Sequence, residues 1–242
     1  MSAPLSRRLL AEFLGSAFLA ALVIGFGIAA QQLSPDDTGL QLLYNSAATA
    51  AGLFAIILMF GPVSGGHINP VVSLVDAAFG GLSRRDTLAY IPAQIAGCVT
   101  GAIAANAMFA LSAISISDKH RASPAHVFAE VIATLGLLLV IFALARSGRS
   151  STAPAAVGAY IGAAYWFTSS TSFANPAITV GRMFSDTFAG IAPAAAPAFV
   201  AAQLVGGAVA FGLIRTLYPD VGPADAADVV VPHRDVVGEA VE

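Results

Sequence analysis

Charged residues are scarce in this 242-residue sequence, and their scarcity excludes a broad class of fold. Only 10% of the residues are charged, 57% are hydrophobic and the mean hydropathy is +0.80, whereas a soluble domain usually carries about 25% charged residues. Six of the 14 acidic residues follow Leu217, so the preceding chain is poorer still in charge. This composition excludes a soluble globular domain and predicts a membrane protein.

Basic clusters, cysteines and enzyme motifs are also rare or absent. The 11 lysines and arginines form no cluster interleaved with aromatic residues and the net charge is -3, so nucleic acid is excluded as a partner. The single cysteine, Cys98, permits neither an internal disulfide nor a multi-cysteine metal site, and we expect a buried small hydrophobic residue. The sequence has no His-Glu-x-x-His motif, phosphate-binding glycine loop or Gly-x-Ser-x-Gly turn. We therefore expect no enzyme activity, no cofactor and no metal.

Six hydrophobic stretches are long enough to cross a bilayer, which takes about 20 helical residues. They lie at about 9–30, 41–62, 87–112, 125–145, 152–169 and 192–217. The first is too long for the core of a cleaved signal peptide, so we expect it to be retained. Two further apolar segments, 69–79 and 175–185, have 11 residues each. At about 1.5 Å per residue, each would reach only about 16 Å, or half the membrane.

The arginines give these segments an orientation. Seven of them fall on one side of the predicted spans: Arg7, Arg8, Arg84, Arg85, Arg146, Arg149 and Arg215. That side is expected to be cytoplasmic, with both termini inside. The first short segment must then start in the middle of the membrane and return inward, whereas the second starts in the middle and leaves outward. We expect the two half-helices to meet head to head.

The two halves of the chain are similar, which predicts a first repeat over 9–112 and a second over 125–217. Three motifs recur in the same order: Ala-Glu at Glu12 and Glu130, Asn-Pro at Asn69 and Asn175, and Ala-Gln at Gln94 and Gln203. Because each half has three spans, the second copy is inserted upside down, an arrangement whose functional site lies between the copies at the bilayer midplane. The acidic segment 218–242 is expected to be a flexible cytoplasmic tail, either solvated or bound to a partner.

The two Asn-Pro pairs are suited to start the half-helices and to line a passage. Asn69 and Asn175 can cap a helix with the side-chain oxygen, and Pro70 and Pro176 suit the first helical position. The asparagine NH2 groups then need acceptors, which a solute in a pore can supply. Two helix N-termini also make the meeting point electropositive, which disfavours cations and hydronium but not neutral molecules.

With these motifs the chain resembles the aquaporin, or major intrinsic protein, family. GGHINPVVS and SFANPAITVGR are similar to its paired NPA signatures, and the resemblance covers about 9–217. It implies an all-α membrane fold of six tilted helices around one pore per subunit, with two re-entrant half-helices and usually a homotetramer in the lipid. The central constriction would comprise the two Asn-Pro pairs with Val71, which replaces the usual alanine of the first motif, and Ala177 of the second.

The outer filter implied by the resemblance differs from the family pattern. The family usually has arginine directly after the second NPA, where this chain has Ile178 followed by Thr179. By offset from the motifs, Thr49 and either Gly162 or Ala163 complete the filter, which should be wide and less polar. This pattern is similar to a bacterial subgroup associated with arsenous acid, so we expect a multi-pass protein of a bacterial inner membrane that passes water and small uncharged solutes such as glycerol or arsenous acid.

Two polar residues near the motifs have alternative roles. Arg182 lies four residues beyond Ile178 and either curls back to the pore or, as we favour, forms a salt bridge with an acid such as Asp186 or lies in the vestibule. His67 either packs the loop, as we favour, or acts as a pH gate or lines the inner vestibule. Asp76 is expected to be solvated or paired with Arg84 or Arg85.

The buried glutamates separate the favoured function from its main rival. By resemblance, Glu12 and Glu130 accept hydrogen bonds from the re-entrant loops, and Gln94 and Gln203 satisfy neighbouring polar groups. A proton-coupled secondary transporter would instead use a glutamate as its titrating site. A non-conducting membrane scaffold is a further alternative. The sequence favours a passive, bidirectional channel.

Overall fold

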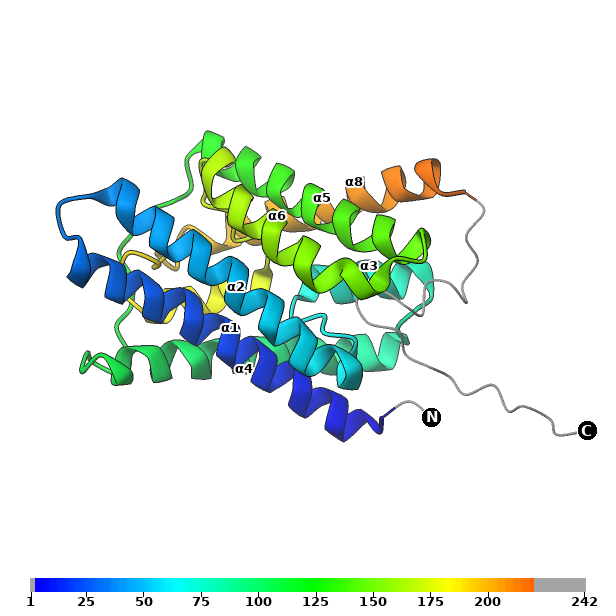
Figure 1. Cartoon of the computed structure of the whole chain (residues 1–242), viewed down its shortest axis with the longest axis horizontal. Coiled ribbons are helices and arrows are strands. Elements are labelled where there is room, and N and C mark those ends of the chain that lie inside the picture. Colours follow the sequence, from blue (N-terminus) through cyan, green and yellow to red (C-terminus); the bar gives the residue numbers. More distant parts are fainter. Residues whose placement is uncertain (1–2, 220–242) are drawn as a thin grey trace, which may run out of the picture.

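The computed structural model describes residues 3–219, so most of the predicted tail lies outside the described residues. Figure 1 shows the helices, which are α1 (Leu5–Leu33), α2 (Thr38–Ser64), α3 (Pro70–Phe79), α4 (Arg84–Met108), α5 (Pro124–Arg146), η1 (Ser150–Thr152), α6 (Ala153–Phe167), α7 (Pro176–Gly181), η2 (Arg182–Phe184) and α8 (Ala196–Leu217). No strand occurs among these residues. The all-α fold expected from the hydrophobic runs is therefore observed.

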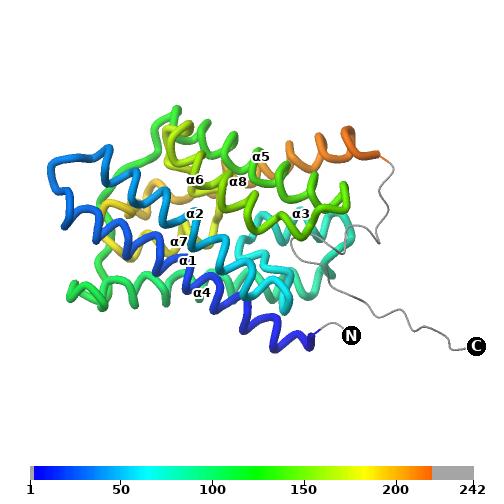
Figure 2. Tube along the Cα trace, in the orientation of Figure 1, coloured from blue at the N-terminus to red at the C-terminus, as the bar shows by residue number. Residues whose placement is uncertain are grey.

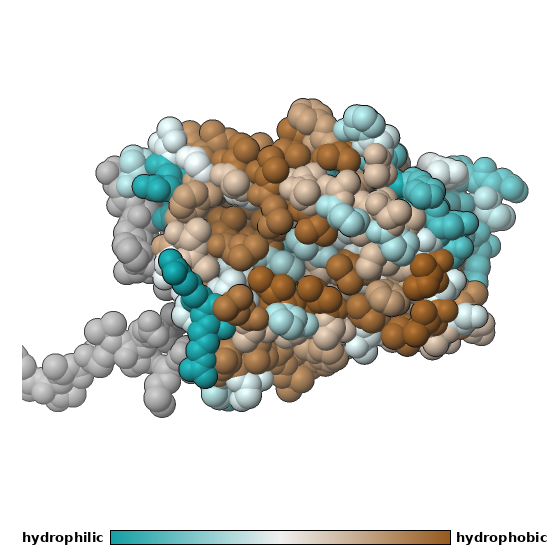
Figure 3. Space-filling view, turned by 180° about the vertical axis from the view of Figure 1, so that it is seen from behind, coloured by the Kyte–Doolittle hydropathy of each residue, from teal (hydrophilic) through white to brown (hydrophobic). Residues whose placement is uncertain are grey.

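Five of the described helices, α1, α2, α4, α5 and α8, are long and apolar enough to cross a membrane. The sixth predicted span, 152–169, becomes α6, which has only 15 residues. The short segments are α3, with 10 residues, and α7, with six residues that continue into the 3-10 turn η2. The space-filling view in Figure 3 has mostly apolar residues across the middle of the face and polar residues towards the two ends, as expected for a bilayer protein.

The long helices pack in two similar groups around the half-helices (Figure 2). Helix α1 packs against α2 and α4, α5 packs against α6 and α8, and α2 packs against α6 to join the groups. The half-helices α3 and α7 contact one another between these groups. The two predicted repeats thus bring their short segments together in the interior.

Glycines allow two of the helix crossings to be close. A Cβ atom on Gly97 of α4 would overlap with the carbonyl oxygen of Phe13 in α1, and a Cβ atom on Gly206 of α8 would lie 2.6 Å from the carbonyl oxygen of Val131 in α5. Gly97 and Gly206 follow Gln94 and Gln203 by the same three positions. The two crossings therefore use equivalent positions of the repeats, and small residues are what such membrane helix contacts require.

Replacing Gly101 by alanine should destabilise the protein. A Cβ atom at Gly101 of α4 would overlap with the backbone of Ala17 in α1, whereas no atom lies within 4 Å of a Cβ atom placed on Gly212 of α8. We expect Gly101→Ala to lower the free energy of unfolding by about 1–3 kcal/mol, the usual cost of overpacking. Unfolding in detergent measures the effect, with Gly212→Ala as the matched control. Equal stability of the two variants would contradict the close crossing.

Candidate functional site

The two asparagines begin the half-helices as the sequence predicts. The Asn69 side-chain oxygen accepts a hydrogen bond from the Val71 N–H at 3.0 Å, and the Asn175 oxygen accepts from the N–H groups of Ala177 and Ile178 at 2.9 and 3.2 Å. Pro70 and Pro176 occupy the first helical positions. Both caps have extended backbone, which is normal for a helix N-cap.

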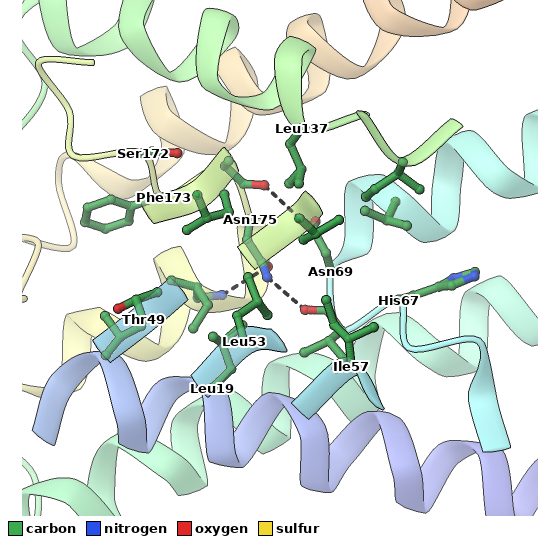
Figure 4. Close-up of a pocket in the computed structure, with 18 of the residues that line it drawn as sticks. Leu19, Thr49, Leu53, Ile57, His67, Asn69, Leu137, Ser172, Phe173 and Asn175 are labelled. Atoms are coloured by element: carbon green, nitrogen blue, oxygen red, sulfur yellow. Dashed lines mark hydrogen bonds between the residues drawn. The ribbon is translucent and has the colours of Figure 1, made fainter. Parts of the chain in front are cut away.

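Each asparagine also binds the loop that precedes the other. The Asn69 amide nitrogen donates to the Ala174 carbonyl at 2.8 Å, and the Asn175 amide nitrogen donates to the Ile68 carbonyl at 2.8 Å. Figure 4 shows these reciprocal hydrogen bonds at the centre of the site. Each NH2 group therefore donates one N–H to the protein and keeps the other for a solute, so the two asparagines offer two donors.

Two buried glutamates hold the loops that carry these carbonyls. Glu12 accepts hydrogen bonds from the N–H groups of His67 at 3.1 Å and Ile68 at 2.7 Å. Ile68 and Ala174, the residues before the asparagines, have positive φ values of 50° and 47°. Such a conformation is uncommon for residues other than glycine and needs support from its surroundings. The carboxylate supplies that support in the first half.

The second half repeats this arrangement. Glu130 accepts hydrogen bonds from the N–H groups of Phe173 and Ala174, both at 2.9 Å. Gln94 donates to Glu12 and Gln203 donates to Glu130, each at 2.7 Å. All four side chains are fully buried. The structure thus brings the four predicted support residues into contact with the half-helix loops.

A cavity of about 60 Å³ surrounds the two asparagines. Thr49 and Phe173 lie on one side of the asparagines and His67 lies on the other (Figure 4). We call the side with Thr49 and Phe173 the Arg182 end, because Arg182 stacks on Phe173. We call the opposite side the His67 end. Between the ends the lining is mostly aliphatic: Leu19, Val23, Leu53, Ile57, Val72, Leu137, Ile141, Val157, Ile161 and Ile178. The asparagines are therefore the polar groups in the middle of an apolar passage.

Four residues predicted for the central constriction do not line this cavity. Pro70, Val71, Pro176 and Ala177 are buried but are not part of its wall. Val71 instead packs toward α8, where a Cβ atom on Gly207 would lie 2.6 Å from it. The prediction is corrected to Asn69 and Asn175 alone, because the residues at the start of a half-helix point in different directions around its axis.

The filter position predicted on α6 is also wrong. Gly162 faces α2, where an added Cβ atom would lie 2.9 Å from that of Ala50, and Ala163 is exposed on the outer surface. Ile161 and Tyr165 line the cavity instead. They are four residues apart and share a helix face. The predicted position was found by counting residues back from Asn175. That count crosses the irregular loop 168–175, which does not have the spacing of a helix.

Thr49 and Ile178 do line the cavity, as predicted, but the filter is not the weakly polar one expected. The Thr49 hydroxyl lies 3.2 Å from the Tyr165 hydroxyl. Arg182 also lines the cavity, with its guanidinium 3.4 Å from the centre of the Phe173 ring and its Nε donating to the Ala189 carbonyl. A cation is thus present at this end, supplied one helical turn beyond Ile178.

The salt bridge favoured for Arg182 is not observed. Within residues 3–219, ion pairs shorter than 4.0 Å join only Arg8 to Asp86 and His67 to Asp76. Asp186 instead accepts hydrogen bonds from the Ser117 hydroxyl and the Asp118 N–H, both at 3.3 Å. Arg182 instead lies in the wall of the same cavity as Thr49 and Ile178, with only 3% of the residue exposed, which fits the alternative that we did not favour, in which it turns back to the pore.

Two further cations, which the sequence analysis did not associate with the site, lie behind Arg182. Arg121 donates to the carbonyls of Gly190 at 2.8 Å and Phe188 at 2.9 Å, and Lys119 donates to that of Thr187 at 3.1 Å. Burial lowers the pKa of both Lys119 and Arg121, and the positive charge of Arg121 lowers the pKa of Lys119 further. The loop 109–123 carries them across the chain onto residues 187–190, a contact that no local sequence signal indicates.

At the other end His67 lines the cavity and pairs with an acid. Its Nδ1 lies 3.0 Å from the Ser73 hydroxyl and its Nε2 lies 3.5 Å from an Asp76 carboxylate oxygen. Asp76 is 3% exposed, so it is not solvated as one expectation had it, and its ion pair is with His67 and not with Arg84 or Arg85. His67 thus belongs to the packed loop and also lines the cavity, as two of its expected roles require. No cluster of potential metal ligands occurs among the described residues.

The helical fold and the asparagine-centred cavity define a membrane channel of the re-entrant half-helix type. The sequence matches the family model described as "MIP: Major intrinsic protein" over residues 1–174. It is 47% identical over 219 residues to "Aquaglyceroporin AqpS" of Rhizobium meliloti (strain 1021), covering 90% of this chain and 93% of that protein. It is 30% identical over 235 residues to "Aquaporin NIP1-3" of Oryza sativa subsp. japonica, covering 88% and 76%. The chain belongs to the major intrinsic protein family.

A solved structure supports the same fold. The aquaglyceroporin from Plasmodium falciparum superimposes with a TM-score of 0.70 at 20% sequence identity, covering 89% of this chain and 98% of that one. At this identity the similarity concerns the fold alone. The predicted family and the predicted aquaporin-like fold are thus confirmed.

Replacing Glu130 by glutamine should destabilise the second half-helix loop. The new NH2 group would face a backbone N–H that now donates to the carboxylate, leaving a buried donor without an acceptor. We expect a loss of about 1–3 kcal/mol in the free energy of unfolding. Thermal unfolding in detergent measures it. Asp37→Asn is the control, because Asp37 caps the exposed start of α2 and asparagine caps equally well. A loss no larger than that of the control would refute the support role.

Proposed function

We propose that this chain is a passive, bidirectional channel for water and small uncharged solutes of about the size of glycerol. The observation that carries the proposal is the position of Asn69 and Asn175, whose remaining N–H donors lie in the middle of a cavity lined mostly by aliphatic side chains. Such a wall offers a passing molecule few hydrogen bonds except at this point. Neutral molecules with an acceptor oxygen suit it.

Charge selection follows from the same geometry. Two helix N-termini meet at the asparagines and Arg182 lies in the wall beyond them. Each helix start carries a partial positive charge. A cation entering the passage would lose its water and meet positive potential, so monovalent cations and hydronium should be excluded.

The solute range is supported by the relatives and by the lining. Aquaglyceroporin AqpS is similar over 90% of this chain, and Ile178 stands where the sequence pattern of the family usually has arginine. Glycerol and arsenous acid are both small, uncharged and carry several hydroxyl groups, and we propose both as solutes. The subunits would form a homotetramer in a bacterial inner membrane, with the termini and the His67 end on the cytoplasmic side.

The proton-coupled transporter is the weaker proposal. Its titrating glutamate would have to gain and lose a proton during each cycle, yet both oxygens of Glu12 and of Glu130 accept hydrogen bonds that hold the half-helix loops. Protonation would remove acceptors from buried N–H groups. A channel only equilibrates its solute, so uptake of glycerol against a gradient driven by a pH difference would favour the transporter.

An arginine at position 178 should narrow the passage. Ile178 lines the cavity and is four residues before Arg182 on the same face, so Ile178→Arg would place a second guanidinium beside the first. We expect glycerol and arsenous acid permeability to fall by about tenfold, a rise of about 1.4 kcal/mol in the barrier, and water permeability to fall less. Stopped-flow swelling of proteoliposomes with water, glycerol, urea and arsenous acid measures this.

The matched control is Ile178→Val, which keeps an apolar side chain and should keep the solute order. Equal changes for water and for every solute in Ile178→Arg would place the bottleneck elsewhere. Swelling of the unmodified protein no faster than empty vesicles would favour a non-conducting scaffold and overturn the channel itself.

A further inference from the structure

Three cations converge on one short stretch of backbone at the Arg182 end. Lys119 donates to the carbonyl of residue 187, Arg121 to those of residues 188 and 190, and Arg182 to that of residue 189. Both arginines also face the Phe173 ring, with distances of 3.4 Å for Arg182 and 5.5 Å for Arg121 from the guanidinium carbon to the ring centre. Because Phe173 is part of the cavity wall, the two arginines place their positive charges beside this end of the cavity.

No carboxylate of the described residues neutralises these cations by contact. The ion pairs within residues 3–219 involve other groups. Asp186 lies near enough to Lys119 to oppose the lowering of its pKa, but its oxygen accepts from Ser117 and Asp118, and Asp118 itself is exposed. Glu130 accepts from the loop N–H groups. Carbonyl oxygens accept the side-chain hydrogen bonds of all three cations.

Arg182 retains donors that no described residue uses. Its Nε binds the Ala189 carbonyl, but neither terminal nitrogen donates to an atom of residues 3–219. The residue is nevertheless 97% buried, because only 3% of it is exposed, and it lines the cavity. No Arg182 atom is among the side-chain atoms of the described residues that are buried without a partner, so the terminal nitrogens reach the open space of the cavity, where a ligand can accept their hydrogen bonds. The face of Phe173 stabilises the charge but accepts no hydrogen bond in the guanidinium plane.

We propose that the Arg182 end is a binding site for a small tetrahedral oxyanion, such as sulfate or phosphate. Two parallel N–H donors match two oxygens of such an ion, which is the geometry for which arginine is preferred. Arg121 and Lys119 supply the surrounding positive potential. A bound ion would occupy the mouth and slow the flow of neutral solutes.

Binding can be tested without flux. The purified protein in detergent, free of lipid phosphate, should unfold at a higher temperature in sodium sulfate than in sodium chloride of equal ionic strength. Arg182→Gln should weaken sulfate binding by about tenfold, as expected when a charge-assisted hydrogen bond is lost. Arg121→Gln and Lys119→Gln should weaken sulfate binding less than Arg182→Gln does. These two variants test the site if Arg182→Gln fails to fold. Arg149→Gln is the control, because this exposed arginine makes its side-chain contact with Ser147.

The consequence for transport rests on the proposed function. Proteoliposomes of phosphatidylcholine under osmotic shock should swell more slowly in sulfate than in chloride, and the ratio of the two rates should approach one in Arg182→Gln. No sulfate-dependent stabilisation, or the same stabilisation in Arg182→Gln as in Arg149→Gln, would overturn the oxyanion site. Sulfate binding with swelling no faster than empty vesicles in either salt would keep the site and overturn the channel instead.

Discussion

The reciprocal hydrogen bonds between the two Asn-Pro motifs are the constraint on which the rest of the structure depends. Asn69 binds the carbonyl before Asn175 and Asn175 binds the carbonyl before Asn69, both at 2.8 Å. Neither half-helix can span a membrane, and in a bilayer an unpaired backbone group is costly. The cross-bonds satisfy both loop carbonyls at once and fix the two helix starts against each other. The solute passage exists because this junction closes one face of the asparagines and leaves the other free.

The support of this junction is the same in both halves. In each, a glutamate accepts the loop N–H groups, a glutamine donates to that glutamate, and the glutamine also donates to a hydroxyl on the half-helix, Ser73 in the first and Thr179 in the second, at 3.0 Å. These residues lie at matching places in the two repeats. A single polar unit thus serves twice, and the close glycine crossings bring the long helices near enough for it to form.

Much of this centre could be predicted from the sequence, because its signals are local or duplicated. The Asn-Pro starts depend on adjacent residues, and the paired glutamates and glutamines are found by comparing the halves. The α6 filter position could not be predicted, because Ile161 and Tyr165 replace Gly162 or Ala163 through the length of an irregular loop. The sequence left two alternatives open for Arg182 and could not choose between them, since a long side chain can leave its helix face and stack on Phe173 from another segment. Lys119 and Arg121 reach the site through a loop contact with no periodic pattern.

The duplicated scaffold ends in two unlike mouths. Counted from the asparagines, His67 corresponds to Phe173 and Asp76 corresponds to Arg182, and in each half the ring two residues before the asparagine contacts the charged group seven residues after it. One copy thus places an acid where the other places a base. The electrostatic potential therefore differs between the two ends of the lumen. A dipolar molecule would take the same orientation in this field from whichever side it enters. The end that leads on entry from one side would thus trail on entry from the other.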